Sequence, residues 1–397
     1  MSRGQVTERG GSSWVFVLGW DLQYVGGVSQ VVKSLYDCFE RTVSQRPLLL
    51  VGDWDSVKPR LESVDGRRTY YGRLRPPFKR GVPWRSALGF LVTLPVQLIR
   101  WRAILGRERA SVVNVHFPGL ESWLWLFLRA ILPIKVVLSF HGSDLRIALE
   151  SRGLERWLWR ELIRRVDWIV VCSHDLRVSM IESFSCEPGK VVALDNGVDP
   201  DAITAEVASE PECDVPARYV LSAATLEAKK GHDILIEAFN TVATRDSSLH
   251  LVIAGRPAEP EYVELLERLR VNSPFGARIH VLKNLPHGRV MRMMAGALVT
   301  VLASRVEPFG IVVLEAGVLR RPAIATDVCG VVRRLDPSSE ISIVPASDAE
   351  SLAQALFVML TDPAAREQQA ELLHKRVLAD FQWSRIARQY ALLAEAR

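Results

Sequence analysis

Cysteine is scarce in this chain, with five residues in a total of 397. None stands in a Cys-x-x-Cys pair, and none has a histidine at a spacing typical of metal ligands. This pattern excludes a disulfide framework and gives no indication of a zinc site. We therefore expect a reducing, cytoplasmic location.

Long apolar runs are also missing. Residues 1–10 lack the apolar core of a secretory signal, and no later run reaches the roughly 20 apolar residues that span a bilayer. We expect that the protein is not an integral membrane protein. Because 48% of the residues are apolar and 24% are charged, disordered and collagen-like classes are excluded as well.

Acidic residues are rare between Lys58 and Arg109: this segment contains thirteen lysines and arginines but only three acids. This excess has three interpretations: a solvated basic face, attraction to anionic lipid headgroups or to a phosphorylated acceptor, and nucleic-acid binding. No nucleic-acid recognition module accompanies the basic segment, so we expect no nucleic-acid partner. A peripheral contact with an anionic membrane remains open.

Short β-branched runs alternate with amphipathic stretches of ten to fifteen residues, which is typical of βαβ units around parallel sheets. The alternation starts afresh near the middle of the chain. We therefore expect an α/β protein with two Rossmann-like, doubly wound domains. The expected strands are Trp14–Gly19, Pro47–Val51, Ser111–His116, Lys135–Phe140, Trp168–Ser173 and Lys190–Leu194, and then Tyr219–Ala223, Leu249–Ala254, Arg278–Leu282, Leu298–Leu302, Ala323–Thr326 and Ile341–Pro345.

A segment rich in proline, alanine and acids, Asp199–Arg218, lies between the two series and is interpreted as a linker. We predict domains at residues 1–200 and 201–380. Residues 381–397 form a helix that could pack back on the first domain. Ligands of such sheets bind beyond the carboxyl ends of the strands, so two facing domains would hold a substrate in the cleft between them.

Two acids stand eight positions apart in Glu307-Pro-Phe-Gly-Ile-Val-Val-Leu-Glu315, directly after an expected strand. Gly310 permits a tight entry into a helix that begins near Ile311. Free N–H groups at that helix start favour phosphate binding. A diphosphate with a carboxylate on each side, each able to bind hydroxyls, describes a nucleotide-sugar site.

The block Ser304–Ala316, which contains these acids, resembles the E-x7-E signature of the retaining, GT4-like GT-B glycosyltransferases. The resemblance extends over nearly the whole chain and implies the two-domain GT-B fold. It implies that Glu307 contacts the hydroxyls of the donor sugar and that Glu315 binds the ribose hydroxyls. Phe309, Gly310 and Ile311 would lie beside the donor.

A second block, Thr225–Asp233, is similar to the family segment Arg-x-x-x-x-Lys-Gly, whose cations neutralise the donor diphosphate. Lys230 matches the lysine, but Thr225 stands where the family has arginine. Another basic residue would supply the missing charge, or turnover would be slower. The candidates are Lys229, Arg256 and Arg305.

Two loops of the first domain also match the family. Gly26 and Gly27 follow the first strand, where a Gly-Gly loop faces the donor diphosphate. His141, in Phe140-His-Gly-Ser-Asp144, would reach the donor sugar near the reacting carbon, and Asp144 would shape the pocket. His116 would orient the acceptor side.

The sequence departs from the family at Leu319-Arg320-Arg321-Pro322, where Cys-Gly-x-Pro is usual, and at Cys329-Gly330-Val-Val-Arg333, where Gly-Gly-x-x-Glu is usual. These changes affect the identity of the donor more than the fold. Asp53-Trp-Asp55 has the spacing of a metal-binding Asp-x-Asp motif, but acids in a surface loop explain it better. We expect no cofactor and no essential metal.

Two segments are apolar over much of their surface. Gly119–Leu132 is expected to form a buried helix. Leu88–Trp101 has basic flanks and could lie in a membrane interface, with Trp84 and Trp101 at headgroup depth. Core packing explains the same residues, so both interpretations remain.

The sequence therefore predicts a retaining glycosyltransferase in which His141, Glu307 and Lys230 are catalytic. It would transfer a hexose from a UDP- or GDP-sugar to a glycan or lipid-linked glycan, in the synthesis of a cell-surface polysaccharide. One alternative is a GT-B-fold sugar epimerase, which would use no acceptor. The other is a non-catalytic partner whose donor site has decayed, which Thr225 and Arg320 favour and the intact Glu307 and Glu315 oppose.

Overall fold

The computed structural model describes residues 13–21, 26–42, 46–56, 58–211, 215–395. These residues form two compact units. Unit 1 contains the residues up to Leu194 together with those from Ile386, and unit 2 contains Asp195–Arg385.

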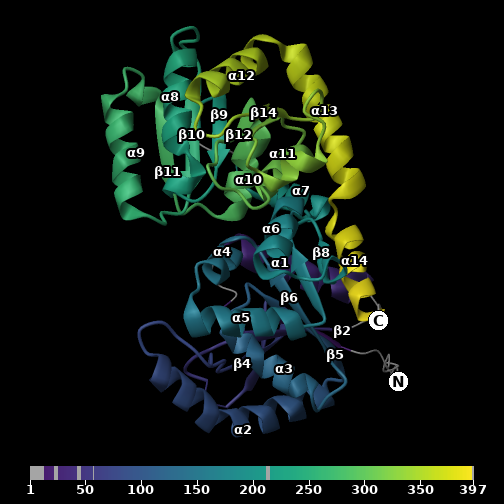
Figure 1. Ribbon diagram of the computed structural model, residues 1–397. Helices are drawn as coiled ribbons and strands as arrows, with labels where there is room; N and C mark the ends of the chain where they lie inside the picture. Colours follow the sequence, from purple (N-terminus) through teal and green to yellow (C-terminus); the bar gives the residue numbers. More distant parts are fainter. Residues whose placement is uncertain (1–12, 22–25, 43–45, 57, 212–214, 396–397) are drawn as a thin grey trace, which may run out of the picture. The chain divides into compact units, whose positions relative to one another are not determined.

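Unit 1 is built on a sheet that has eight strands within the described residues, in the order β3-β4-β2-β1-β5-β6-β7-β8. All of its pairings are parallel except that of β3 with β4. Apolar side chains of β1, β2, β5 and β6 form the centre of the core. The strands are β1 Ser13–Leu18, β2 Arg46–Gly52, β3 Arg60–Val64, β4 Arg67–Gly72, β5 Ala110–His116, β6 Lys135–Phe140, β7 Trp168–Val171 and β8 Val191–Ala193 (Figure 1).

Unit 2 repeats this design with a parallel sheet of six strands among its described residues, in the order β11-β10-β9-β12-β13-β14. Strand order reverses between β9 and β12, which is the switch point where doubly wound sheets bind ligands. The strands are β9 Tyr219–Ala223, β10 His250–Gly255, β11 Ile279–Lys283, β12 Val299–Leu302, β13 Ala323–Thr326 and β14 Ser342–Val344. The two Rossmann-like sheets confirm the predicted fold class.

Helices cover both sheets (Figure 1). In unit 1 they are α1 Gly27–Thr42, α2 Pro83–Arg107, α3 Trp123–Arg129, α4 Ser143–Leu149, α5 Gly153–Arg165 and α6 His174–Phe184. In unit 2 they are α7 Pro200–Ser209, α8 His232–Ala243, α9 Pro260–Asn272, α10 His287–Gly296, α11 Ile311–Val318, α12 Ala349–Thr361 and α13 Pro363–Asp380, followed by α14 Trp383–Glu395 at the end of the described chain.

All twelve expected strands are present, but the sequence analysis missed β3 and β4. These two strands form an antiparallel hairpin with Asp65 and Gly66, both at positive φ, in its turn. All but one residue of β3 are exposed, so this strand lacks the apolar alternation that predicts a strand. Four of the six residues of β4 are buried, but its sequence begins with two arginines and shows no apolar run. Part of the basic segment Lys58–Arg109 therefore forms the edge of the unit 1 sheet.

The predicted linker Asp199–Arg218 is wrong over its first half, which is helix α7. Asp199 caps the helix, since its carboxylate accepts a hydrogen bond from the Ala202 N–H at 3.2 Å. Pro200 occupies the first helical position, where its missing N–H costs nothing. Residues 212–214 of this segment lie outside the described residues.

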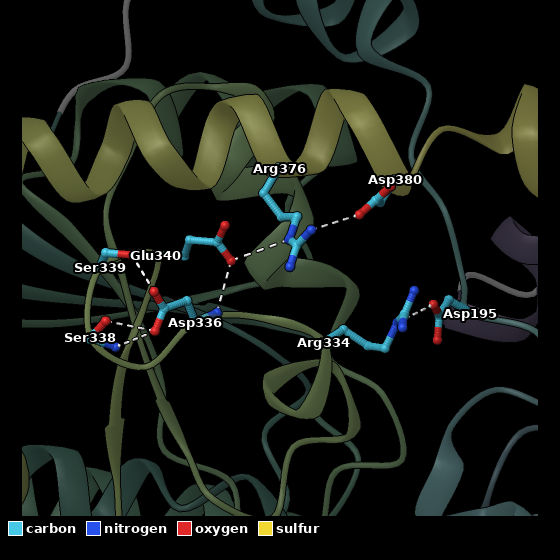
Figure 2. A network of polar contacts seen from close by, with 8 residues as sticks. All are labelled: Asp195, Arg334, Asp336, Ser338, Ser339, Glu340, Arg376 and Asp380. Atoms are coloured by element: carbon cyan, nitrogen blue, oxygen red, sulfur yellow. Dashed lines mark hydrogen bonds and ion pairs between the residues drawn. The ribbon is translucent and has the colours of Figure 1, made fainter.

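The two chain segments that connect the units are paired with each other inside unit 2. The N–H of Val198 donates to the Phe381 carbonyl, and the N–H of Trp383 donates to the Val198 carbonyl. Arg334 binds Asp195 at 3.0 Å, directly before this pairing. Figure 2 shows Arg334 and Asp195 beside a second group, in which Arg376 joins Glu340 and Asp380.

Helix α2 corrects two expectations. Among the described residues it is the helix that is long and apolar enough, by length and composition, to cross a membrane. The prediction that no segment reaches this length is therefore wrong. The predicted place of Trp101 in a membrane interface is wrong as well, because Trp101 is 1% exposed and packs against Trp125 in the core.

Candidate functional site

Lys230 and Glu307 form an ion pair at the carboxyl edge of the unit 2 sheet. Nζ of Lys230 lies 2.7 Å from Oε2 of Glu307, and both side chains are largely buried. Burial opposes the charge of Lys230, but attraction to Glu307 and the hydrogen bond between them outweigh it and raise the pKa of the lysine. Lys230 therefore keeps its positive charge at neutral pH.

Gly231 allows the loop that carries Lys230 to approach the end of β12. Its φ is +67°, and an added Cβ would lie 2.0 Å from the carbonyl oxygen of Ala303. The N–H groups of Arg305 and Val306 both donate to the carbonyl of Lys229, at 2.8 and 3.3 Å. These contacts hold the loops of Lys230 and Glu307 together.

The loop between β12 and α11 turns at Gly310, which has a φ of +100°. Helix α11 starts at Ile311, as predicted. The Val313 N–H donates to the Gly310 carbonyl at 3.1 Å, while the N–H groups of Ile311 and Val312 have no intrahelical acceptor. Phe309 is 2% exposed, and its carbonyl accepts a hydrogen bond from the Val331 N–H at 2.8 Å. A backbone donor group thus lies next to the Lys230–Glu307 pair.

Glu315 lies further along α11 and is bound to a histidine that the sequence analysis did not identify. Oε1 of Glu315 is 3.1 Å from Nε2 of His287, and Nδ1 of His287 is 2.6 Å from Oε2 of Glu206. The hydrogen bond with Glu315 makes the largest contribution to raising the pKa of His287, which reaches about 9. At neutral pH a charged imidazolium therefore bridges two carboxylates.

Two of the three candidates for the missing cation at Thr225 are already paired with acids. The Thr225 hydroxyl donates to Glu227, and Lys229 pairs with the same Glu227 at 3.1 Å. Arg305 binds Asp233 through two hydrogen bonds, of 2.8 and 2.6 Å. Of the three candidates, Arg256 is the one for which the described residues show no such side-chain pairing.

Unit 1 places His116 and His141 in direct contact. Nδ1 of His116 lies 3.1 Å from Nε2 of His141, and the rings stack at 5.3 Å. Burial lowers the pKa of His141 to about 4, so this imidazole is neutral at physiological pH. Asp144 accepts hydrogen bonds from the N–H groups of His141 and Gly142 and fixes the loop, while burial raises its pKa to about 6.

Gly26 and Gly27 also belong to unit 1, at the start of α1. Both are exposed, and an added Cβ at either would meet no atom of the described residues within 4 Å. Residues 22–25 of the same loop lie outside the described residues. The backbone of the Gly-Gly pair is thus open to a ligand.

A pocket of about 360 Å³ opens beside this loop in unit 1. Its walls are the ends of β1, β2 and β5 and part of α4. Four aromatic rings and three carboxylates contribute to its lining. They belong to Trp20, Trp54, Phe117 and Trp159, and to Asp53, Glu121 and Asp144.

The first acid of the Asp-x-Asp motif, Asp53, is hydrogen-bonded to neighbouring residues. Asp53 accepts hydrogen bonds from the Ser56 hydroxyl, from the Asp55 N–H at 3.0 Å and from Arg60 at 3.4 Å. The hydrogen bond from Ser56 is the main cause that lowers the pKa of Asp53. Within the described ranges, no three His, Cys, Asp or Glu side chains gather into a potential metal site.

The structure therefore brings Lys230 and Glu307 into contact, places Gly310, Ile311 and Glu315 on the same helix start, and sets His141, Gly26 and Gly27 in the other unit. Sequence reasoning missed His287 and Glu206. Their spacing in the sequence does not indicate that they are in contact, because His287 stands 28 positions before Glu315 and 81 positions after Glu206.

Comparisons with known proteins match both halves of the chain to glycosyltransferases. Residues 208–375 match the family described as Glycosyl transferases group 1, and residues 25–202 match Glycosyltransferase Family 4. Glycogen synthase of Mycobacterium tuberculosis is 26% identical over 71% of this chain and 69% of its own. Alpha-D-kanosaminyltransferase of Streptomyces kanamyceticus is 27% identical over 69% of this chain and 74% of its own.

Among solved structures, Anabaena Alr3699/HepE in complex with UDP and glucose superposes with a TM-score of 0.75. It is 14% identical, and the match covers 97% of this chain and all of that one. At a sequence identity this low, the structural similarity shows that the two proteins share a fold and shows nothing about substrates. Together with the two family matches, it identifies the chain as a GT-B glycosyltransferase of the GT4-like type.

Proposed function

We propose that this enzyme transfers a hexose, with retention of configuration, from a UDP- or GDP-sugar to a glycan or lipid-linked glycan. The observation that carries the proposal is the buried Lys230–Glu307 pair beside the N-terminus of α11. A cation and free N–H groups are suited to a diphosphate, and carboxylates are suited to sugar and ribose hydroxyls. His287 binds one carboxylate oxygen of Glu315, and within the part of the chain that the structure describes no hydrogen bond uses the other oxygen.

In the proposed reaction, Lys230 and the N–H groups of α11 stabilise the departing diphosphate. Glu307 and His141 hold the sugar. The bond between the anomeric carbon and the phosphate oxygen breaks, and the acceptor hydroxyl bonds to that carbon from the same face. The hydroxyl proton passes to the leaving phosphate, so no protein nucleophile and no metal is required. The solved Anabaena structure, described with UDP and glucose, supports a nucleotide-sugar donor.

Calorimetric titration tests the donor site. We expect one of UDP and GDP to bind, and Glu315→Ala to weaken that binding by about 10- to 100-fold, because hydrogen bonds to a charged group contribute roughly 1.5–3 kcal/mol each. The matched control is Glu264→Ala, which removes an exposed glutamate of α9 in the same unit and should leave affinity unchanged.

If neither nucleotide binds to the wild-type protein, the proposed donor site is wrong. If a nucleotide binds but Glu315→Ala and Glu264→Ala behave alike, the site lies elsewhere. Release of nucleotide that depends on an acceptor separates a transferase from an epimerase.

For the acceptor, we propose the pocket of unit 1. Sugar rings present apolar C–H faces that pack on aromatic rings, and their hydroxyls donate to carboxylates. Trp54 and Trp159 with Asp53 and Glu121 offer both kinds of contact. A glycan therefore fits this lining better than a phosphorylated acceptor, which the carboxylates would repel.

A membrane contact is proposed on α2. Six large apolar residues are exposed along one side at helical spacing: Trp84, Leu88, Leu91, Val92, Val96 and Ile99. The helix has no acid, and Arg85, Arg102 and Arg107 are exposed near its ends. An apolar stripe with basic ends fits the interface of an anionic membrane. It also fits a lipid-linked acceptor on the cytoplasmic face and, through it, the assembly of a cell-surface polysaccharide.

Vesicle flotation tests this contact. We expect the protein to float with anionic vesicles and to remain at the bottom with zwitterionic ones. A double substitution, Val92→Glu with Ile99→Glu, should reduce flotation at least tenfold, because it buries two charges in the membrane. Val271→Glu, at an equally exposed valine of α9, is the control.

The absence of flotation with either vesicle would rule out the membrane contact. A protein that does not float but dimerises, and that becomes monomeric in the double variant, would show that a second copy covers the stripe instead.

A further inference from the structure

A chain of buried polar side chains leads to His141 from the interior of unit 1. Asn114 and His116 lie on β5, and both are fully buried. The amide nitrogen of Asn114 lies 3.0 Å from Nε2 of His116, and Nδ1 of His116 lies 3.1 Å from Nε2 of His141. Ser139 on β6 completes the chain, since its hydroxyl donates to the amide oxygen of Asn114 at 2.8 Å.

Each link determines the direction of the next. An amide nitrogen can only donate, so Nε2 of His116 must accept. A neutral imidazole that accepts at Nε2 carries its proton on Nδ1, and His116 therefore donates to Nε2 of His141. His141 in turn carries its proton on Nδ1, the ring nitrogen that points away from His116.

Packing buries the His116 ring and keeps both histidines of this hydrogen-bonded series neutral. Tyr390 stacks on the His116 ring at 6.4 Å, with His141 stacked on the same ring at 5.3 Å. Burial lowers the pKa of His116 well below its ordinary value, with a further contribution from His141. Neither ring takes up a proton near pH 7, so the direction of the hydrogen bonds is not lost by ionisation.

His141 itself is only partly buried, and no hydrogen bond among the described residues uses its Nδ1. The series of hydrogen bonds from Ser139 to His141 thus ends in a single N–H group, at Nδ1 of His141, which is available to a ligand. Without Asn114 and His116, a neutral histidine would exchange between its two tautomers and would present this donor for part of the time.

We propose that Asn114 and His116 are positioning residues that hold His141 as the Nδ1–H tautomer, so that it presents a hydrogen-bond donor to an oxygen of the substrate. The proposal rests on the proposed function in one respect, that the substrate is the sugar donor. The group that His141 recognises is an oxygen that accepts a hydrogen bond, on a sugar hydroxyl or on a phosphate. An N–H group of a sugar could not form this hydrogen bond, because Nδ1–H can only donate.

Nitrogen-15 NMR of the histidine rings tests the tautomer in the full-length protein without any ligand. The chain has eight histidines, and the signals of the two rings are assigned from spectra of His116→Gln and His141→Gln. We expect both rings to be neutral with the proton on Nδ1. A His141 ring protonated on Nε2, or an even mixture of tautomers, would overturn the proposal.

Asn114→Asp is the informative variant, because a carboxylate can only accept a hydrogen bond from His116. We expect both rings to change to the Nε2–H tautomer, which would leave a lone pair at Nδ1 of His141. The turnover of the donor, measured as kcat/KM, should fall by about tenfold, the effect of one lost hydrogen bond, while nucleotide affinity stays unchanged. Asn272→Asp, at an exposed asparagine of α9, is the control.

A spectrum of Asn114→Asp in which His141 keeps its proton on Nδ1 would contradict the role of Asn114. If this variant does not fold, Ser139→Ala tests the same chain, since a freed Asn114 amide should give a mixture of tautomers at His141. The ring spectra do not depend on donor binding. A correct tautomer with no effect on turnover would therefore refute the substrate role alone.

Discussion

Replacement of Lys230 by glutamine is expected to lower kcat by about 100- to 1,000-fold, the effect of removing one preorganised donor from a site where negative charge develops. Glutamine keeps the length and a hydrogen-bond donor but loses the charge. Thr225 stands where the resemblance implies an arginine, and its hydroxyl is bound to Glu227, so we expect Lys230 to carry most of the positive charge that meets the diphosphate.

Lys229→Gln is the matched control. It is the neighbouring lysine, it is 42% exposed, and it pairs with Glu227 instead of Glu307. We expect its kcat to remain within about twofold of the wild type, because exposed ion pairs contribute little. Hydrolysis of the donor by water serves as the assay, which requires no acceptor. Equal losses in both variants would contradict the assignment to Lys230, and loss of activity in EDTA would show that a metal carries the charge.

The sequence predicted the fold wherever burial on both faces of a strand leaves a continuous apolar run. Lys135–Phe140, Tyr219–Ala223 and Ala323–Thr326 were predicted to the residue for this reason. The hairpin β3–β4 was missed because the edge strand β3 is exposed and β4, although four of its six residues are buried, is too short and too polar to show such a run. Helix α7 was missed because its proline and acids were interpreted as linker composition, although Asp199-Pro200 is a helix start.

Sequence motifs predicted part of the candidate site. Glu307 was predicted from the E-x7-E block after an expected strand, and Lys230 from the resemblance of Thr225–Asp233 to the family segment. Their direct contact was not predicted, since it depends on how closely two loops approach. His287 and Asn114 were missed for a deeper reason: a residue that orients another one is defined by a distance across the fold, and nothing in the local pattern marks it. Burial and hydrogen bonding reveal such residues only in three dimensions.

Close approach of the two loops makes Gly231 the second sensitive position. We expect Gly231→Ala to lower the free energy of unfolding of unit 2 by about 2–4 kcal/mol, the combined cost of a left-handed backbone in a non-glycine residue and of overpacking. The strain is specific: φ is +67°, and the new Cβ would lie 2.0 Å from the carbonyl oxygen of Ala303.

Relief of that clash requires the Lys230 loop to move away from β12, which would lengthen the ion pair with Glu307. Gly231→Ala should therefore lose nucleotide affinity together with stability, although it alters no group that contacts a ligand. Gly189→Ala is the control, because its Cβ would meet no atom within 4 Å and its φ is not in the left-handed range; it should change stability by less than about 0.5 kcal/mol. Urea unfolding and calorimetric titration measure the two effects. A Gly231→Ala protein as stable as the control would show that the loop can rearrange freely, and the rigid contact between the Lys230 and Glu307 loops would then not be what preorganises the site.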